Sequence, residues 1–222
     1  MRTLVIIPAY NESKNLEKLI NDIKSYGYEY IIINDRSTDR TEELAKEKNF
    51  SILNLCLNVG IAGVTRIGFK YAKDHDYDCA VVVDGDGQHQ PKCVHSLIKC
   101  IENGSDYALG SRFVQSKKPW SFRMIGSRII SFLIKIKTGK TIKDPTSGMR
   151  ALGKNVIEEF SVSMNYYAEP DALCHLIKRG YKIEEVQVEM LEREDGISYF
   201  VNPIKSIKYM ISEIISLIFI QW

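Results

Sequence analysis

The sequence predicts an α/β protein with an open, doubly wound, mostly parallel sheet flanked by helices, and three observations support this prediction. Short apolar runs alternate with segments of helical periodicity through the first half of the chain. Polar and glycine-rich motifs follow these runs, as expected where ligands bind at the carboxyl ends of parallel strands. The length of 222 residues and the hydrophobic content of 45% suit one globular domain and exclude disordered and fibrous proteins.

The expected elements alternate in the order that a doubly wound sheet requires. The apolar runs that predict buried parallel strands are 3–7, 30–33, 51–55, 79–83 and 107–110. The segments with helical periodicity are 13–25, 38–49, 62–73 and 91–102. Ser13 and Thr38 are the expected N-caps of the first two helices, and Pro91 suits the first turn of the fourth.

Each of the first four predicted strands leads into a polar motif. In order these are PAYNE at 8–12, NDRSTD at 34–39, NVGIAG at 58–63 and DGDGQH at 84–89. The last motif is the most informative, because Asp84 and Asp86 leave an apolar strand at positions i and i+2 and can both turn toward one divalent cation. Carboxylate oxygens suit Mg²⁺ or Mn²⁺ shared with a diphosphate. A solvated acidic turn is the alternative for an isolated Asp-x-Asp.

Two other ligand loops are excluded by their spacing. No glutamate follows Asp84 at the position that a calcium-binding EF-hand requires. The NVGIAG run is followed by no Lys-Ser/Thr pair and lacks the Gly-x-Gly-x-x-Gly spacing, so it is neither a P-loop nor a dinucleotide fingerprint. Taken alone, this run predicts a tight turn between a strand and a helix.

Seven motifs in order resemble glycosyltransferase family 2 with the GT-A fold. They are PAYNE, NDRSTDRT, NVGIAG, DGDGQHQP, ALGSRF, DPTSGMRA and EREDGIS. The resemblance covers roughly residues 2–210 and is greatest to the branch that contains dolichyl-phosphate mannose synthase and bactoprenol glucosyltransferase. It implies a nucleotide-sugar donor, a divalent metal cofactor (Mg²⁺ or Mn²⁺) and an inverting transfer on the cytoplasmic face of a membrane.

The resemblance also implies a donor site, residue by residue. The positions that match the donor-binding part of the family are Pro8, Ala9, Tyr10, Glu12, Asn34, Asp35, Asn58, Gly60 and Asp84. Those that match the metal- and diphosphate-binding part are Asp84, Asp86 and Gln88. Asn34 departs from the family, which has an aspartate there, and this departure leaves the base of the nucleotide open. The metal would neutralise charge that develops on the leaving nucleoside diphosphate.

The acceptor phosphate is implied to meet arginines that follow the fifth strand. Arg112 matches the arginine of GSRF, and Arg123 with Ser127 matches an Arg-xxx-Ser pair that contacts the phosphate in polyprenyl-phosphate transferases. Guanidinium groups bind phosphate oxygens in a bidentate manner. Arg193 matches a further arginine that reaches the phosphates, with a surface ion pair to a neighbouring glutamate as the alternative.

Two acceptors remain open. A lipid phosphate is already anionic near pH 7 and can attack without deprotonation, whereas a sugar hydroxyl of a lipid-linked or cell-surface glycan needs a general base. Glu169 and Asp171 are the candidate bases, and Glu169 matches an acidic position of the family, while Asp171 equally suits capping of a helix. The implied catalytic residues are Asp86, Glu169 and Arg193.

The charge of the chain is unevenly distributed although the total is only +2. Nine of the 30 basic residues and none of the 28 acidic ones lie between Arg112 and Lys143, so the remainder carries −7. A helical apolar stripe runs through this segment and comprises Ile125, Ile129, Phe132 and Ile136. Because basic amphipathic helices bind anionic membrane surfaces, segment 112–143 is expected to meet the membrane and the acceptor. Nucleic acid is not expected, since no groove-reading motif is present.

The last residues, 204–222, predict an amphipathic helix that follows a GT-A domain at 1–203. This stretch is too short and too charged to span a membrane, so it is expected either to dock on the core or to lie in a membrane interface. Bactoprenol-type relatives often continue into two spanning helices. Both a peripheral enzyme and a truncated chain therefore stay open.

The five cysteines are scattered and never spaced Cys-x-x-Cys, which favours a reducing cytosol. With the resemblance, this predicts a cytoplasmic protein bound peripherally to the inner face of the cell membrane. A nucleotidyltransferase and a non-catalytic membrane-binding module are the alternatives from other classes. The first lacks its glycine-rich basic loop after strand one, and the second would use only the basic segment and the C-terminal stripe. No oligomeric state is predicted.

Overall fold

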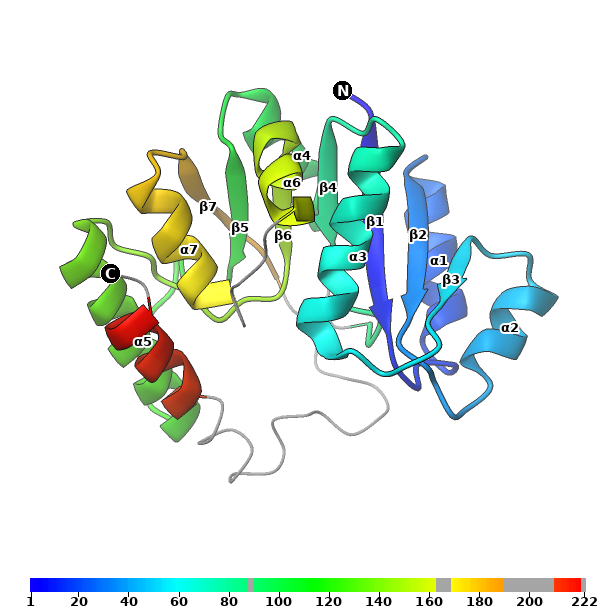
Figure 1. The fold of residues 1–222 in the computed structure, drawn as a ribbon, viewed down its shortest axis with the longest axis horizontal. Helices are drawn as coiled ribbons and strands as arrows, with labels where there is room; N and C mark the ends of the chain where they lie inside the picture. The colour runs from blue at the N-terminus through cyan, green and yellow to red at the C-terminus, as the bar shows by residue number, and fades with distance from the viewer. Residues whose placement is uncertain (88–89, 163–168, 190–209, 221–222) are drawn as a thin grey trace.

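A seven-stranded sheet with helices on both faces forms the centre of the computed structural model, which describes residues 1–87, 90–162, 169–189 and 210–220 (Figure 1). The strands are β1 (Thr3–Ala9), β2 (Glu29–Asn34), β3 (Ile52–Asn54), β4 (Cys79–Val82), β5 (Tyr107–Ser111), β6 (Arg150–Gly153) and β7 (Ile183–Gln187). The helices are α1 (Leu16–Ser25), α2 (Thr41–Glu47), α3 (Gly60–Asp74), α4 (Lys92–Glu102), α5 (Phe122–Thr138), α6 (Lys154–Val162) and α7 (Glu169–Lys178).

The strand order β3-β2-β1-β4-β6-β5-β7 gives a mostly parallel sheet. The pairs β1–β2, β1–β4, β2–β3 and β5–β7 are parallel, and β6 runs antiparallel to both β4 and β5. The five strands expected from the sequence therefore all point the same way, which confirms the α/β prediction. Because β6 is reversed, the loop that precedes it lies at the same sheet edge as the carboxyl ends of the other strands.

The core has two layers because successive side chains of a strand face opposite sides of the sheet. In β1, Leu4 and Ile6 pack with helices α3, α5, α6 and α7, whereas Val5 and Ile7 pack with α1, α2 and α4. All four of these strand residues are buried. Runs without polar alternation are expected for strands covered on both faces, and this explains the continuous apolar runs of the sequence.

Two details of the sequence-based expectation are wrong. The first two helices begin at Leu16 and Thr41 after Asn15 and Arg40, so Ser13 and Thr38 are not their N-caps. The backbone N–H of Ser13 instead donates to the Asp39 carboxylate at 3.1 Å, which places Ser13 in a loop held from a distant part of the chain. The contact between the loops that follow β1 and β2 therefore determines the position of Ser13, and its local capping preference does not.

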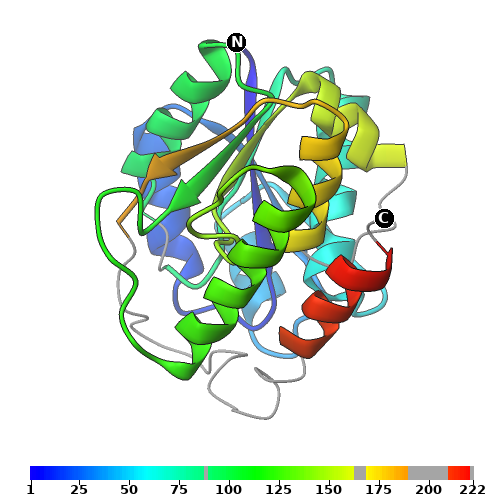
Figure 2. The same cartoon turned by 90° about the vertical axis from the view of Figure 1, so that its left-hand side faces the viewer.

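The C-terminal residues dock on the core. A helix at 210–215 continues as a π-helical turn, η2 (Ser216–Ile220), and lies beside α5 and α7 (Figures 1 and 2). Leu217 is fully buried in the core layer, while Ile211 and Ile215 are about half exposed. Core docking is therefore confirmed for 210–220. The boundary expected at 203/204 falls outside the described residues.

Within the described ranges, none of the helices is both long enough and apolar enough to cross a bilayer.

Candidate active site

The loops that follow β1 and β2 are bound to each other at the carboxyl edge of the sheet. Asn11, in the left-handed region with φ of 59°, accepts hydrogen bonds through Oδ1 from the backbone N–H groups of Thr38 at 2.8 Å and Asp39 at 3.2 Å. The Glu12 N–H donates to Thr41 Oγ1 at 3.0 Å. The structure thus gives the predicted first donor loop, with its half-exposed Tyr10, a fixed shape.

Asp35 joins the end of β2 to the start of helix α3. Its buried carboxylate accepts the backbone N–H groups of Val59 at 2.7 Å and Gly60 at 2.9 Å, one on each oxygen. The Asn58 side-chain amide donates to the Asp35 carbonyl oxygen at 3.0 Å. A carboxylate here satisfies two of the orphan N–H groups of the helix and complements its dipole. The structure therefore brings three of the predicted donor residues together.

Asn34 is buried and its side chain makes contacts inside the protein. Its amide nitrogen donates to Asn54 Oδ1 at 2.8 Å, and its Oδ1 accepts from the Ser37 hydroxyl at 2.6 Å. An aspartate at this position could accept from Ser37 but could not donate to Asn54. The asparagine amide thus uses both its donor and its acceptor inside the protein.

The Asp84–Gly87 loop after β4 lies directly against the end of β1. A Cβ atom on Gly85 would be 2.9 Å from the Pro8 carbonyl oxygen and 3.4 Å from Glu12 Cγ, so only glycine permits this approach. Gly87 has φ of 77°, which turns the chain after Asp86. Asp84 and Asp86 are both partly exposed, and Asp86 borders a surface pocket formed with helix α1. Solvent therefore reaches the second carboxylate.

The donor atoms of this loop fit a divalent cation. The oxygens of Asp84 and Asp86 are the hard ligands that Mg²⁺ and Mn²⁺ prefer, and two carboxylates leave positions for diphosphate oxygens. Among the described residues no cluster of three or more His, Cys, Asp or Glu side chains gathers. Gln88, the third predicted ligand, lies outside the described residues.

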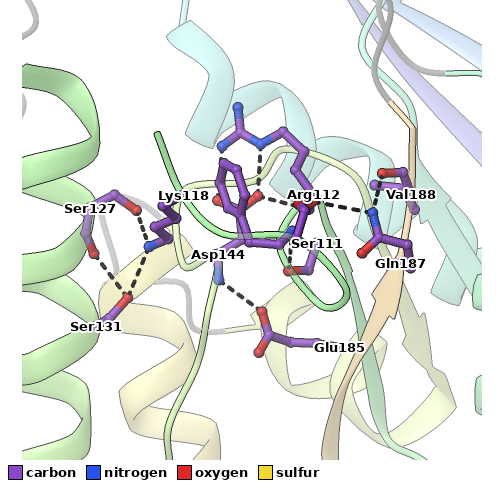
Figure 3. Close-up of polar contacts among 11 residues, drawn as sticks. Ser111, Arg112, Lys118, Ser127, Ser131, Asp144, Glu185, Gln187 and Val188 are labelled. Carbon is purple, nitrogen blue, oxygen red and sulfur yellow. Dashed lines mark hydrogen bonds and ion pairs between the residues drawn. The ribbon is translucent and has the colours of Figure 1, made fainter. Parts of the chain in front are cut away.

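Arg112 and Asp144 form a buried ion pair beside the end of β5 (Figure 3). Arg112 Nε donates to Asp144 Oδ2 at 2.7 Å and Nη2 donates to Oδ1 at 2.8 Å, while Oδ2 also accepts the Arg112 backbone N–H at 3.1 Å. The Asp144 side chain is 0% exposed and the Arg112 side chain 21%. The pair uses one edge of the guanidinium and leaves Nη1 outside it. Asp144 lies within the DPTSGMRA motif, but nothing in the sequence assigned it a partner.

Ser127 is fully buried on α5, and a lysine covers it (Figure 3). Lys118 Nζ donates to the hydroxyl oxygens of Ser127 at 2.8 Å and Ser131 at 3.3 Å. Ser131 in turn donates to the Ser127 carbonyl oxygen at 2.9 Å. The predicted acceptor residue Ser127 therefore lies beneath Lys118, a cation that the sequence distinguishes only as part of the basic segment. The side chain of Arg123, in the first turn of α5, falls outside the description.

The remaining predicted catalytic residues are placed only in part. Glu169 begins α7, but its side chain is outside the description, as is all of Arg193. Asp171 is buried, and its Oδ2 accepts from the Ser216 hydroxyl at 2.6 Å. This contact attaches η2 to α7, which is a structural use of the second candidate base.

The predicted apolar stripe of α5 is exposed. Ile125 and Ile129 are 42% and 43% exposed, and Phe132 and Ile136 are 62% and 64% exposed. The opposite side of the same helix buries Met124, Ile130 and Ile134 in the protein. Trp120, just before the helix, is 85% exposed, and the Arg128 guanidinium lies 4.5 Å from the centre of its ring. Helix α5 therefore packs one apolar side against the core and exposes a second apolar side. Exposed apolar patches of this kind often mark surfaces that contact another molecule.

Comparison with known proteins identifies the class to which this fold and site belong. A sequence model of the family described as Glycosyl transferase family 2 matches residues 4–161. The chain belongs to glycosyl transferase family 2 and is a glycosyltransferase, as the ordered motifs indicated.

Particular relatives agree with the branch that the motifs resemble. The chain is 38% identical over 200 residues to a dolichol-phosphate mannosyltransferase of Pyrococcus furiosus, in an alignment that covers 84% of this chain and 55% of that protein. It is 29% identical over 213 residues to a polyprenol monophosphomannose synthase of Mycolicibacterium smegmatis, covering 89% and 80% respectively. The chain thus spans only a little over half the length of the Pyrococcus relative.

Solved structures agree with the fold. Glucosyl-3-phosphoglycerate synthase of Mycobacterium tuberculosis, determined with Mn²⁺, UDP and glucosyl-3-phosphoglycerate, matches with a TM-score of 0.73 and 17% identity, covering 97% of this chain and 79% of that one. At this identity the likeness shows the shared GT-A fold.

Proposed function

We propose that this chain is an inverting, metal-dependent glycosyltransferase that moves a hexose from a UDP- or GDP-sugar to polyprenyl phosphate at the cytoplasmic face of a membrane. The observation that carries the proposal is Arg112, oriented by a fully buried Asp144 at the same sheet edge as the donor loops. The names of the two relatives, a dolichol-phosphate mannosyltransferase and a polyprenol monophosphomannose synthase, support a lipid phosphate as the acceptor.

The nucleotide sugar is proposed to bind across the ends of β1, β2 and β4. The loop that begins at Pro8 and Ala9 and carries Tyr10 and Glu12 would cradle the nucleotide, and its contacts with the 37–41 loop hold it in one shape before the donor arrives. A preformed loop loses less conformational freedom on binding. Asp35 would support the donor site indirectly, because its carboxylate binds the backbone N–H groups at the start of α3.

Asp84, Asp86 and Gln88 would hold Mg²⁺ or Mn²⁺. When bound, the ion neutralises the negative charge of the departing nucleoside diphosphate. The chain itself keeps two carboxylates at the sheet edge through the close approach of Gly85 to Pro8. The Mn²⁺ and UDP held by the glucosyl-3-phosphoglycerate synthase structure support a divalent ion in this fold.

The acceptor phosphate would need no general base, because its oxygen is already anionic near neutral pH. One displacement at the anomeric carbon inverts the configuration of the sugar. Arg112 would orient the phosphate through the guanidinium edge that Asp144 does not use, with Arg123, Arg193 and Ser127 as further groups of the subsite. Glu169 would matter as a base only if the acceptor were a sugar hydroxyl.

A donor screen with Mg²⁺ and Mn²⁺ tests this proposal by measuring UDP or GDP release with and without polyprenyl phosphate. We expect release to require both the ion and the lipid phosphate. Arg112→Gln should lower turnover at limiting acceptor much more than Glu169→Gln. A large loss of turnover in Glu169→Gln with intact donor binding would instead support a sugar hydroxyl as acceptor.

The exposed stripe of α5 is proposed to lie on an anionic lipid surface. Basic residues surround it in segment 112–143, and both the apolar and the electrostatic attraction of such helices to anionic interfaces are favourable. Phe132→Ser should weaken sedimentation with phosphatidylglycerol-containing vesicles. Val162→Ser, which alters an equally exposed apolar side chain on α6, is the matched control and should not weaken it. Equal vesicle binding by both variants would overturn the membrane assignment.

A further inference from the structure

Lys118 holds a positive charge in a partly buried position without a carboxylate partner among the described residues. Its three ammonium protons meet two hydroxyl oxygens, those of Ser127 and Ser131, at 2.8 and 3.3 Å. Both serines lie on α5, one turn apart, and together they bind the ammonium group. An ammonium group removed from water without a counter-ion is unfavourable, so this position calls for an anion.

The backbone around Lys118 is fixed by Arg128. The Arg128 guanidinium donates to the carbonyl oxygens of Lys118 at 2.7 Å and Pro119 at 3.3 Å, and it stacks over Trp120. Arg128 therefore places a second positive charge next to Lys118 and anchors the segment that carries it to α5. Because the Lys118 segment is already held in place, less conformational freedom is lost when an anion binds to it.

Lys118 and Arg112 flank the same aromatic ring. The Lys118 ammonium lies 5.7 Å and the Arg112 guanidinium 5.1 Å from the centre of the Phe113 ring. The fully buried carboxylate near them, Asp144, is already paired with Arg112 through both oxygens. In the view of Figure 3, the side chains of Lys118 and Arg112 lie on either side of Asp144. Arg112, Lys118 and Arg128 carry three positive charges. Among the described residues, a carboxylate forms a direct ion pair with Arg112 but with neither of the other two.

Electrostatics agrees with this geometry. Burial lowers the pKa of the Lys118 ammonium below its ordinary value, and the charges of Arg128 and Arg112 lower it further, while Asp144 and Glu185 oppose them. Protonated Lys118 is thus less favourable here than in water. A bound phosphate would favour the charged form and would raise this pKa.

We propose that Lys118 is a direct ligand of the acceptor phosphate, positioned by Ser127 and Ser131 and acting beside Arg112. This inference rests on the proposed lipid-phosphate acceptor and adds a residue to its subsite. It also changes the part given to Ser127, which is fully buried beneath Lys118 and serves as a positioning residue. The group that Lys118 would bind is a phosphate monoester.

The proposal includes a dependence on pH. The phosphate monoester is already fully ionised above pH 8, since its second pKa is about 6. Acceptor binding should therefore weaken as the pH rises through the lowered pKa of Lys118. Lys118→Arg should remove this dependence, because guanidinium stays protonated in proteins. The charged groups that face Lys118 and act on its pKa are Asp144, Glu185, Arg112 and Arg128.

The test compares Lys118→Gln and Lys118→Arg with Lys117→Gln, a change at the exposed neighbouring lysine. We expect Lys118→Gln to raise the KM for a short-chain prenyl phosphate about tenfold or more, with the donor KM and the Tm unchanged. Lys118→Arg should restore the acceptor KM and flatten its dependence on pH. Lys117→Gln should stay within about twofold of the parent chain. An unchanged acceptor KM in Lys118→Gln would overturn the proposal.

Calorimetric binding of the same prenyl phosphate without donor separates this inference from the proposed function. If the parent chain binds the lipid phosphate but transfers no sugar, the transferase assignment fails, and loss of binding in Lys118→Gln still supports the ligand role. If the parent chain transfers sugar and Lys118→Gln binds normally, only the inference fails. If the parent chain binds prenol as well as prenyl phosphate, the phosphate subsite itself is contradicted.

Discussion

Asp144 accepts two parallel hydrogen bonds of 2.7 and 2.8 Å from the Arg112 guanidinium, although the two residues are 32 positions apart in the chain. The reversed direction of β6 makes the pair possible, because it returns the loop before β6 to the edge where β5 ends. Arg112 is consequently fixed in orientation before any substrate binds. The proposed acceptor side of the site is therefore held in place by internal contacts, as the proposed donor side is.

Replacing Asp144 with asparagine tests this pair. The substitution would keep the size of the side chain but lose the charge and one acceptor, so Arg112 would be held less firmly. We expect the free energy of unfolding to fall by about 2 kcal/mol. The acceptor KM should rise about tenfold, with little change for the donor. Denaturant titration and steady-state kinetics measure both.

Asp74→Asn is the control for the loss of a paired carboxylate, since the Lys70–Asp74 pair is exposed on the surface. Its Tm should stay unchanged. Equal stability of the Asp144 and Asp74 variants would contradict the structural role of the buried pair.

Asp35→Asn tests the connection between β2 and helix α3. An asparagine can accept one of the two N–H groups now held by the carboxylate and places an amide donor against the other. We expect a loss of about 1 kcal/mol in unfolding free energy and weaker donor binding, because α3 loses its cap. Isothermal calorimetry with UDP and GDP and urea unfolding measure the two effects. Normal donor binding with lowered stability would limit Asp35 to a structural role.

Gly85→Ala tests the approach of the aspartate loop to β1. The new Cβ would lie 2.9 Å from a backbone oxygen of Pro8, so one of the two strand-end loops must move. We expect at least a tenfold loss in metal-dependent donor affinity and a stability cost of about 1–3 kcal/mol. At Gly153 the nearest atom would be 3.4 Å away, which makes Gly153→Ala the matched control. Unaltered donor affinity in Gly85→Ala would show that the loop tolerates displacement.

The Glu159 cluster provides a test of stability against pH. Burial acts to raise the pKa of Glu159, but hydrogen bonds from Tyr181 and His175 and the charge of Arg179 outweigh it and lower that pKa overall. A lowered native-state pKa contributes stability above the unfolded-state pKa, and this contribution is lost as the pH falls through the native-state value. Glu159→Gln should therefore destabilise the chain by about 1 kcal/mol at pH 7 and by much less in acid. A loss independent of pH would contradict this origin.

Much of the sheet could be predicted because its strands are buried on both faces. The runs at 79–83 and 107–110 consist almost entirely of apolar residues, and both form interior strands that run in the same direction as β1. β7 was not predicted, since the adjacent Glu184 and Glu185 of IEEVQ interrupt any continuous apolar run. β6 has only four residues, and its reversed direction depends on the loop that leads to it.

The donor side of the site was more predictable than the acceptor side. Parallel strands bring their carboxyl ends to one edge, so motifs that follow β1, β2 and β4 had to meet. Tertiary packing produces the ion pair between Arg112 and Asp144 and the hydrogen bond from Lys118 to Ser127. The spacing of these residues in the sequence does not reveal either contact. Lys118 was one of nine basic residues with no local signal to distinguish it.

A lipid phosphate, held by Arg112 and its neighbours, is proposed to receive the sugar. The most direct measurement is the rate of nucleoside diphosphate release by the purified chain with a divalent ion and equal concentrations of polyprenyl phosphate or polyprenol. We expect rapid release with polyprenyl phosphate, accompanied by a glycosylated lipid phosphate, and only background release with polyprenol. Equal release with both lipids, or transfer only to a glycan hydroxyl, would contradict it.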